Sequence, residues 1–502
     1  MSDTSANNKR IAKNTLLLYF RMLLLMAVSL YTSRVVLNAL GVEDFGIYNV
    51  VGGVVAMFTV ISGSLSAAIS RFITFELGKS NENNLKKTFS AAVTIQLLLS
   101  LAIVILLETL GVWFLNFKMT IPADRLTAAN WVLQFSIVTF VINLISVPYN
   151  ATIIAHERMS AFAYISIFEA VGKLIIAFLI MVSPIDRLVF YAILMCAVAV
   201  SVRLMYERYC KKHFSECTYH FLWDKELLQR MFGFAGWNFI GSSAGVLRTQ
   251  GINILLNIYF DPIVNAARGI AVQVNNAVSS FSTNFLMAVN PQIIKSYSQQ
   301  DTERAYMLVM YGARFSFLLL SVISLPIISE TEYILKLWLK IVPDYSVVFV
   351  RLALILTIVE AISLPLVTLQ QATGKIRNYQ IVVGTLHMAN FPTSFVFLHF
   401  GFNPEIVYLI AIGLAFISLY ARLYMLKQVI DISIMKFNKD VVFRSITVAL
   451  LMSLSLFMVE GYIHNFFANI IFSLLIAVFW SIIVGLKKQE FIYVYSKMIK
   501  RK

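Results

Sequence analysis

Residues 88–112 read TFSAAVTIQLLLSLAIVILLETLGV, an apolar run with a single charged side chain, Glu108. About 20 consecutive apolar residues cross the hydrocarbon core of a bilayer as an α-helix. The same pattern recurs along the whole chain of 502 residues, which is 59% hydrophobic and 13% charged, with a mean hydropathy of +0.78. Because a soluble protein carries about 25% charged residues, this composition excludes a soluble fold and predicts an integral membrane protein.

Fourteen segments of this kind are expected to span the membrane as helices, so the predicted fold class is all-α. They are continuously apolar rather than alternating, which excludes a spanning β-barrel. The first is too long for the apolar core of a signal peptide and has no small-residue cleavage site, so we expect it to be retained. The predicted spans cover roughly residues 15–37, 46–70, 88–112, 127–149, 160–183, 186–206, 231–257, 262–288, 308–328, 346–369, 379–400, 405–426, 442–462 and 465–486.

Lysine and arginine are concentrated in alternate connecting segments. If the N-terminus is cytoplasmic, the inner segments hold 29 of these residues, the outer loops hold five and the spans hold seven. This asymmetry predicts that both termini are cytoplasmic and that the number of spans is even. The formal net charge of +15 is therefore interpreted mainly as an orientation signal and as attraction to anionic membrane lipids, with no nucleic acid as a partner.

The chain also carries a weak internal repeat. A shift of about 220 residues superposes spans one to six on spans seven to twelve, which predicts two six-helix repeats, a central cavity and two additional C-terminal helices. This is the architecture of a transporter. The expected parts are a cytoplasmic lead (1–14), an N-terminal lobe (15–208), an inter-lobe loop (209–230), a C-terminal lobe (231–427), a cytoplasmic loop (428–441), the last two helices (442–486) and a basic tail (487–502).

Cations inside the spans are the first candidates for substrate binding, because a charged side chain at membrane depth is costly unless it is solvated or paired. The seven are Arg21, Arg34, Lys173, Arg248, Arg268, Arg314 and Arg351. Arg21, Arg34, Arg314 and Arg351 lie near span ends, where snorkelling to the interface is the alternative interpretation. Arg248 and Arg268 have no acidic residue nearby in sequence. We therefore expect them to be unpaired and to bind an anion such as a phosphate, whose geometry suits a guanidinium.

Acidic and amide residues inside the spans form a second group of candidates. Glu169 lies four residues before Lys173, so the two share a helix face, and both mutual neutralisation and a substrate role remain open. Glu360, His387 and Glu169 are candidates for carrying a coupling ion, H⁺ or Na⁺, and a purely structural hydrogen-bonded role is the alternative. Polar residues expected to line the cavity are Asn49, Asn238 and Asn276, although close helix packing also explains the small and polar residues around Asn49.

Metal and cofactor chemistry have little support in the sequence. Cys210, His213, Cys217 and His220 are zinc-ligand types, but on one helix they would be too spread to surround an ion, so only an irregular loop could bring them together. No nucleotide-binding loop or catalytic motif is present, and no outer loop is long enough for a catalytic domain. The sequence predicts no metal, no cofactor and no enzymatic activity.

Several segments, together with the doubled core, resemble the polysaccharide-exporter branch of the multidrug/oligosaccharidyl-lipid/polysaccharide (MOP) flippase superfamily. The segments are 32–49 (TSRVVLNALGVEDFGIYN), 264–269 (VNAARG), 290–297 (NPQIIKSY) and 372–375 (ATGK), and the likeness covers nearly the whole chain. The resemblance implies a MATE-like fold in the bacterial cytoplasmic membrane. It also implies ion-coupled flipping of an undecaprenyl-diphosphate-linked oligosaccharide, such as an O-antigen unit, from the inner to the outer leaflet, with membrane lipids and polysaccharide assembly proteins as partners. Arg34, Arg248 and Arg268 match the kind of basic position that such proteins use.

Three other functions are weighed against this one. A multidrug or cation antiporter of the same superfamily needs carboxylates in its core, whereas the spans hold seven cations and four acids. A flippase for the peptidoglycan lipid precursor would also carry an anionic cargo, so the charge of the spans does not distinguish it. A membrane glycosyltransferase, polymerase or ligase would need paired acids in a large outer loop. The charge inside the membrane favours an anionic, lipid-linked cargo.

Overall fold

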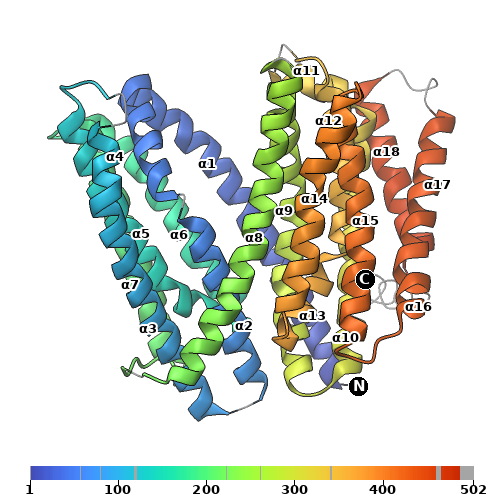
Figure 1. Ribbon diagram of the computed structural model, residues 1–502, viewed down its shortest axis with the longest axis horizontal. Helices are drawn as coiled ribbons and strands as arrows, with labels where there is room; N and C mark the ends of the chain where they lie inside the picture. The colour runs from blue at the N-terminus through green and yellow to red at the C-terminus, as the bar shows by residue number, and fades with distance from the viewer. Residues whose placement is uncertain are drawn as a thin grey trace, which may run out of the picture. The chain divides into compact units, whose positions relative to one another are not determined.

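The computed structural model describes residues 2–56, 58–79, 81–117, 121–221, 223–260, 262–339, 342–459 and 465–486. Within these ranges the chain consists of helices and their connections, without strands (Figure 1). The long apolar runs become helices because a helix satisfies its own backbone hydrogen bonds where no water is present. The expected all-α fold is confirmed. Inside the helices, the side chains of Arg34 and Asn49 lie outside the described residues.

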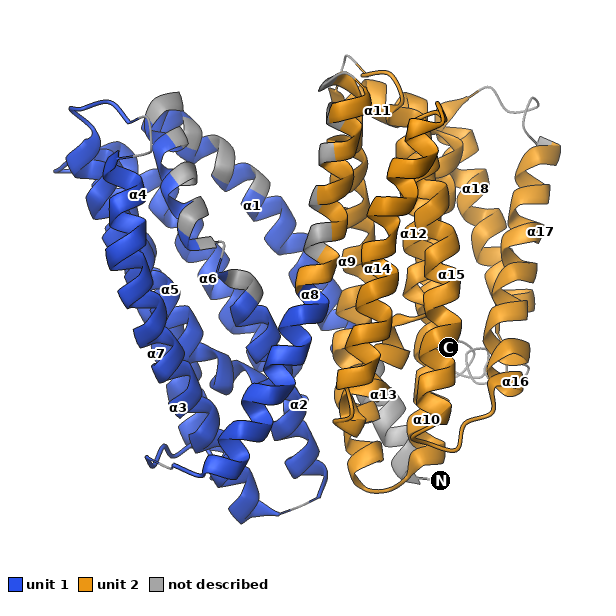
Figure 2. Ribbon diagram, in the orientation of Figure 1, with its two compact units in different colours: residues 1–242 blue, residues 243–502 orange. Residues whose placement is uncertain are grey.

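The first of two compact units covers residues 1–242 (Figure 2). In this unit α1 packs on α6, and α5 packs on α7, α2 and α3. A π-helical turn, Leu107–Gly111, joins α3 to α4 without a break. Its helices are α1 (Ser2–Ala56), α2 (Thr59–Gly78), α3 (Glu82–Leu106), α4 (Val112–Phe117), α5 (Leu126–Ala155), α6 (Met159–Leu179), α7 (Arg187–His213) and the first part of α8 (Lys225–Tyr259).

The second unit covers residues 243–502. Here α9 packs on α10, α12 and α13, and α14 packs on α15. The final helices α17 and α18 pack on each other and on α10, where the hydroxyls of Ser329 and Ser473 lie 3.1 Å apart. The unit contains the rest of α8, α9 (Pro262–Ser298), α10 (Thr302–Ser329), α11 (Thr331–Leu339), α12 (Ser346–Ala361), α13 (Leu364–Thr373), α14 (Arg377–His399), α15 (Ile406–Lys427), α16 (Ile434–Phe437), α17 (Phe443–Val459) and α18 (Phe466–Trp480).

Within the described residues the predicted spans lie on helices, and the second, 46–70, runs from the end of α1 into α2. Among the described residues, ten helical stretches are long and apolar enough to cross a membrane. The predicted first, second, seventh and eighth spans are not among these ten; they lie on α1, α2, α8 and α9, which carry the polar residues noted in the sequence. The protein is an integral membrane protein. Its unit boundary falls within α8, after the start predicted for the C-terminal lobe at residue 231, and the lobe limits remain a prediction.

A sharp break interrupts α1 at Gly41. Its φ of 82° and ψ of 169° belong to a backbone region that only glycine adopts readily. Beside the break, the Arg125 guanidinium binds both carboxylate oxygens of Asp44, at 2.8 and 2.6 Å, and an oxygen of Asp186 at 2.6 Å. Burial acts to raise the pKa of the Asp186 carboxyl, but the hydrogen bond and positive charge of Arg125 outweigh it and hold that pKa below its ordinary value.

Candidate functional site

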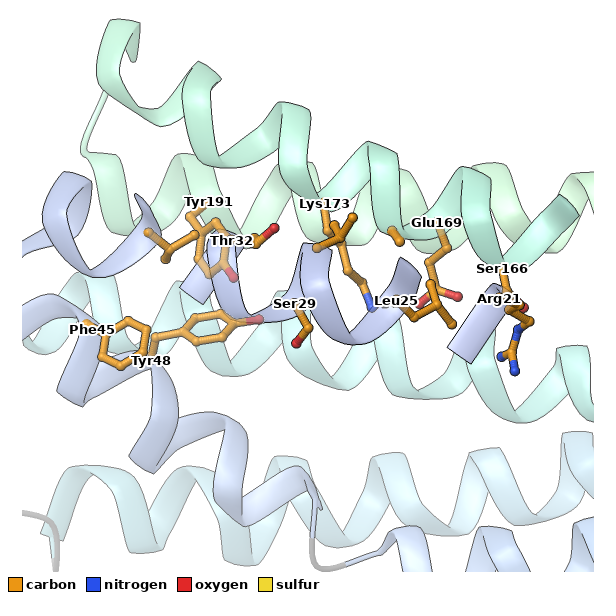
Figure 3. Close-up of a pocket in the computed structure, with 13 residues that line it drawn as sticks. Arg21, Leu25, Ser29, Thr32, Phe45, Tyr48, Ser166, Glu169, Lys173 and Tyr191 are labelled. Carbon is orange, nitrogen blue, oxygen red and sulfur yellow. Dashed lines mark hydrogen bonds and ion pairs between the residues drawn. The ribbon is translucent and has the colours of Figure 1, made fainter. Parts of the chain in front are cut away.

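The first candidate site is a cavity of about 470 Å³ inside the first unit, between α1, α6 and α7 (Figure 3). One face of α1 forms a wall, because Arg21, Leu25, Val28, Thr32 and Val36 recur at three- or four-residue spacing. Figure 3 shows Phe45, Tyr48 and Tyr191 toward one end of the cavity and Arg21 and Glu169 toward the other, with Lys173 between them. The remaining lining residues are Ser29, Ser166 and Ala170.

The charged groups of this cavity are only partly neutralised. Lys173 Nζ donates a hydrogen bond of 2.6 Å to Glu169 Oε1, and both side chains are about 40% exposed. Arg21 stacks its guanidinium carbon 4.3 Å from the centroid of the Phe162 ring, and its Nε has no hydrogen-bond partner among the described residues. The mutual neutralisation of Glu169 and Lys173 that their spacing allowed is therefore present, and Arg21 supplies the remaining positive charge.

The second candidate site is a cavity of about 180 Å³ inside the second unit. It is built by α8, α9, α12, α14 and α15, which are distributed over more than half of the second unit. Its polar lining residues are Arg248, Thr249, Arg268, Asn275, Asn276, Thr357, Glu360, Asn390 and Tyr408. Four of the residues predicted from sequence thus share one cavity: Arg248, Arg268, Asn276 and Glu360.

Arg248 is paired, so the expectation that it lacks an acidic partner is wrong. Its Nη1 lies 3.0 Å from Glu360 Oε1, which belongs to a helix 112 residues further along the chain. The same nitrogen lies 3.2 Å from His387 Nδ1. His387 Nε2 in turn lies 3.4 Å from Arg422 Nη2, and Arg422 Nε donates to the Tyr379 hydroxyl at 3.2 Å. Local spacing does not reveal this network because its members come from four different helices.

Arg268 is also hydrogen-bonded, but to neutral groups. Its Nη1 donates to the Thr249 carbonyl at 3.0 Å and to the Asn253 side-chain oxygen. The side chain is 8% exposed, so the guanidinium is held close to α8 with little freedom to move. Neither of these hydrogen-bond partners carries a negative charge, so the positive charge of Arg268 remains available to the cavity.

The other residues predicted from sequence have different positions. Lys173 and Glu169 line the first cavity, and His387 lies behind Arg248 at the second. Asn238 is buried in the part of α8 that belongs to the first unit and does not line the cavity there. Arg34 and Asn49 fall on side chains outside the described residues.

Sequence reasoning missed several lining residues. Arg21, for which a cavity role and snorkelling to the interface are both open from the sequence, lines the first cavity. The signal that would have found it is the polar stripe that it forms with Ser29 and Thr32 on one face of α1. Tyr48, Tyr191 and Tyr408 carried no such signal, because aromatic residues are common throughout membrane helices.

The cysteine and histidine residues at the end of α7 and in the loop that follows are not all brought together. Cys210 and Cys217 are buried, whereas His213 is exposed and its Nδ1 lies 2.9 Å from the Tyr209 carbonyl oxygen. His220 is also exposed. Within the ranges that the structure describes, no three His, Cys, Asp or Glu residues are placed to hold a metal ion.

Both cavities have the same charge balance. The first is lined by Arg21, Lys173 and Glu169, and the second by Arg248, Arg268 and Glu360. Among the lining residues that the structure describes, each cavity therefore carries two cations and one carboxylate, a surplus of one positive charge. A guanidinium in a partly dehydrated cavity is suited to bind phosphate oxygens, and hydroxyl and amide groups are suited to bind sugars.

The fold and the charged cavities define a polytopic helical membrane protein with the architecture of a transporter. Residues 11–297, more than half of the chain, match the family described as polysaccharide biosynthesis protein. The chain belongs to this family. No curated protein matches the chain.

Solved structures of MATE transporters share the fold at low sequence identity. A MATE crystal structure in complex with MaD3S aligns with a TM-score of 0.74 and 11% identity, over 84% of this chain and 96% of that one. An outward-facing multidrug resistance MATE transporter of the MOP superfamily gives 0.71 and 12%, over 83% and 94%. A MOP superfamily transporter from Pyrococcus furiosus, for which reverse polarity of the binding pocket suggests a different function, gives 0.70 and 11%, over 83% and 94%. The MATE-like fold is confirmed.

Proposed function

We propose that this protein is a flippase that moves an oligosaccharide linked to undecaprenyl diphosphate from the inner to the outer leaflet of the bacterial cytoplasmic membrane. The observation that carries the proposal is the surplus of positive charge in each cavity of a member of a polysaccharide biosynthesis family. A diphosphate linked to sugars is anionic and rich in hydroxyls, so it complements such a lining. Arg248, Arg268 and Lys173 would bind the diphosphate, with Arg34 as a fourth cation, and Asn49 and Asn276 would contact the sugars.

The paired carboxylates suggest how an ion would drive the cycle. Lys173 and Arg248 each bind a carboxylate in the structure, so a phosphate that takes either cation leaves Glu169 or Glu360 without its partner. Binding of H⁺ or Na⁺ from the outer side would neutralise the same carboxylate on the return half of the cycle, since an uncompensated charge is costly at membrane depth. Because the cargo moves outward and a driving ion moves inward, the two would use the carboxylate pair in opposite halves of the cycle. In this scheme the protein performs no covalent chemistry.

The test is deletion of the protein in its own host, followed by complementation. We expect the deletion strain to lose surface polysaccharide and to accumulate a lipid-linked sugar on the cytoplasmic leaflet. Arg248→Gln and Arg268→Gln should fail to restore export although they reach the membrane at the wild-type level. Arg230→Gln is the matched control, because that side chain is exposed and lies 4.0 Å from the nearest carboxylate.

Other outcomes would redirect the assignment. Full export by both cavity variants would overturn the proposed site. Increased drug sensitivity without any accumulated lipid-linked sugar would identify a multidrug antiporter. Accumulation of the peptidoglycan precursor would identify a flippase for that lipid. Co-purification with polysaccharide assembly proteins would test the proposed partners, and labelling of each terminus from either side would test the proposed cytoplasmic orientation.

A further inference from the structure

His387 lies between two arginines in the second unit. Its Nδ1 is 3.2 Å from Arg248 Nη1 and its Nε2 is 3.4 Å from Arg422 Nη2. The three residues come from α8, α14 and α15, so the imidazole connects a helix of the cavity wall to the C-terminal end of α15. The imidazole is therefore in contact with a guanidinium at each of its two nitrogens.

These two contacts cannot both be hydrogen bonds at the same time. A guanidinium only donates, and a neutral imidazole has one nitrogen that accepts and one that donates. An imidazolium has no acceptor at all and would place a third positive charge between the two guanidiniums. The ring is therefore neutral, and its tautomer decides which arginine it binds.

Each arginine keeps another partner when the imidazole turns away. Arg248 remains bound to Glu360 at 3.0 Å, and Arg422 remains bound to the Tyr379 hydroxyl at 3.2 Å. Neither tautomer leaves a guanidinium without a hydrogen bond, so the two states are similar in energy. A modest change at either end is then sufficient to select one of them.

We propose that His387 is a positioning residue that couples occupancy of Arg248 to Arg422. In the empty cavity Nδ1 accepts from Arg248 and the ring proton is on Nε2. When an anionic phosphate takes the Arg248 donor, the ring proton moves to Nδ1 through water, and Nε2 accepts from Arg422. The ring gains and loses no net proton. The proposal rests on the proposed function only for the identity of the anion.

This role differs from proton carriage, one of the two roles that the sequence leaves open for His387. A proton carrier would alternate between charged and neutral forms, whereas here the His387 ring, which forms the junction between Arg248 and Arg422, exchanges one neutral tautomer for the other. It also assigns a function to Arg422, which lies in the last two turns of α15. Cargo binding would tighten α15 against α14 at this point and so change the packing of two helices of the unit.

The ring proton can be followed directly by ¹⁵N NMR of histidine-labelled, full-length protein in lipid nanodiscs. Inorganic pyrophosphate is the probe, and the His387→Gln variant assigns the signal. We expect saturating pyrophosphate to move the His387 signals from the Nε2–H to the Nδ1–H pattern. An unchanged pattern, under conditions where pyrophosphate binds, would overturn the proposal.

Substitutions at Arg422 test the coupling by affinity. Arg422→Gln should weaken pyrophosphate binding about tenfold, because the hydrogen bond to a charged donor that forms upon switching is lost. Arg422→Lys should restore most of the affinity, since it keeps a charged donor. His387→Asn and His387→Gln form a second pair: the shorter amide stays with Arg248 and should weaken binding, whereas the longer one reaches Arg422 and should not.

The outcomes separate this inference from the proposed function. Calorimetric titration of Arg248→Gln should show loss of pyrophosphate binding. Unchanged pyrophosphate binding by that variant would show that Arg248 is not part of the anion-binding site. Loss of binding in Arg248→Gln, together with wild-type affinity in Arg422→Gln, would remove the junction and leave the cation site intact.

Discussion

The described lining residues of the two cavities carry equal charges but come from different arrangements of helices. In the first unit the acid and its cation, Glu169 and Lys173, lie one turn apart on α6 and are about 40% exposed. In the second unit the acid and its cation, Glu360 and Arg248, come from α12 and α8 and are 34% and 24% exposed. Opening the first pair moves a flexible side chain, whereas opening the second pair releases one helix from another.

This difference assigns different tasks to the two sites. A pair within one helix contributes little to tertiary structure, because helix formation alone brings its members together. A pair between helices stabilises a particular arrangement and is sensitive to whatever displaces one member. We infer that binding at the second cavity changes helix packing. The first cavity provides a cation, Lys173, whose flexible side chain can move without separating helices.

The largest effect is expected from Glu360→Gln. The substitution leaves Arg248 in a low-dielectric cavity without its acid, and because the pair is partly exposed we expect a loss of about 2 kcal/mol, less than for a fully buried pair. The measurement is the free energy of unfolding in mixed micelles. The double variant Glu360→Gln/Arg248→Gln should recover part of this loss. Stability equal to the wild type in the single variant would show that the pair does not hold α8 to α12.

The next effect concerns the break in α1 at Gly41. Gly41 adopts a φ of 82° and a ψ of 169°, and a Cβ there would meet no atom within 4 Å, so the requirement for glycine is conformational rather than steric. Gly41→Ala should cost about 1–3 kcal/mol. Gly413→Ala, in the middle of α15 with equally open surroundings, is the matched control and should not destabilise. Equal stability of Gly41→Ala and the wild type would show that α1 continues without this break.

The helices and one ion pair could be predicted from sequence because they depend on local patterns. The apolar runs located the spans, and four-residue spacing brought Glu169 to Lys173. The pairing of Arg248 with Glu360 was missed, since 112 residues separate them and only tertiary packing brings them together. Arg21 lies near a span end, where snorkelling also explains a charge, so only the polar stripe on α1 indicates from sequence that it lines a cavity.

Lowering the pH should have a smaller effect on stability, through the ion pairs of Arg125 with Asp44 and Asp186 that join α1 to α5 and α7. Burial raises the pKa of Asp186, but Arg125 lowers it by more than burial raises it. The folded-state pKa therefore lies below the ordinary value of about 3.9. The stabilisation is therefore present above about pH 4 and is lost as pH falls through the folded-state pKa. Because Asp186 is partly exposed, the loss should be below about 1 kcal/mol. Comparing wild type and Asp186→Asn between pH 5 and pH 3 tests this, and an equal acid loss in both would contradict it.

The smallest effect is expected from Glu169→Gln, the counterpart of Glu360→Gln in the first cavity. An i,i+4 pair contributes about 0.2–0.5 kcal/mol, so the free energy of unfolding should change by no more than that amount. Transport should respond differently, because Lys173 loses its carboxylate and stays free to bind an anion. We expect Glu169→Gln to retain or increase pyrophosphate binding while losing the dependence of transport on the coupling ion. If Glu169→Gln destabilised the protein as much as Glu360→Gln, the first pair would also hold helices together, and the distinction between a compliant cavity and a packing-sensitive one would fail.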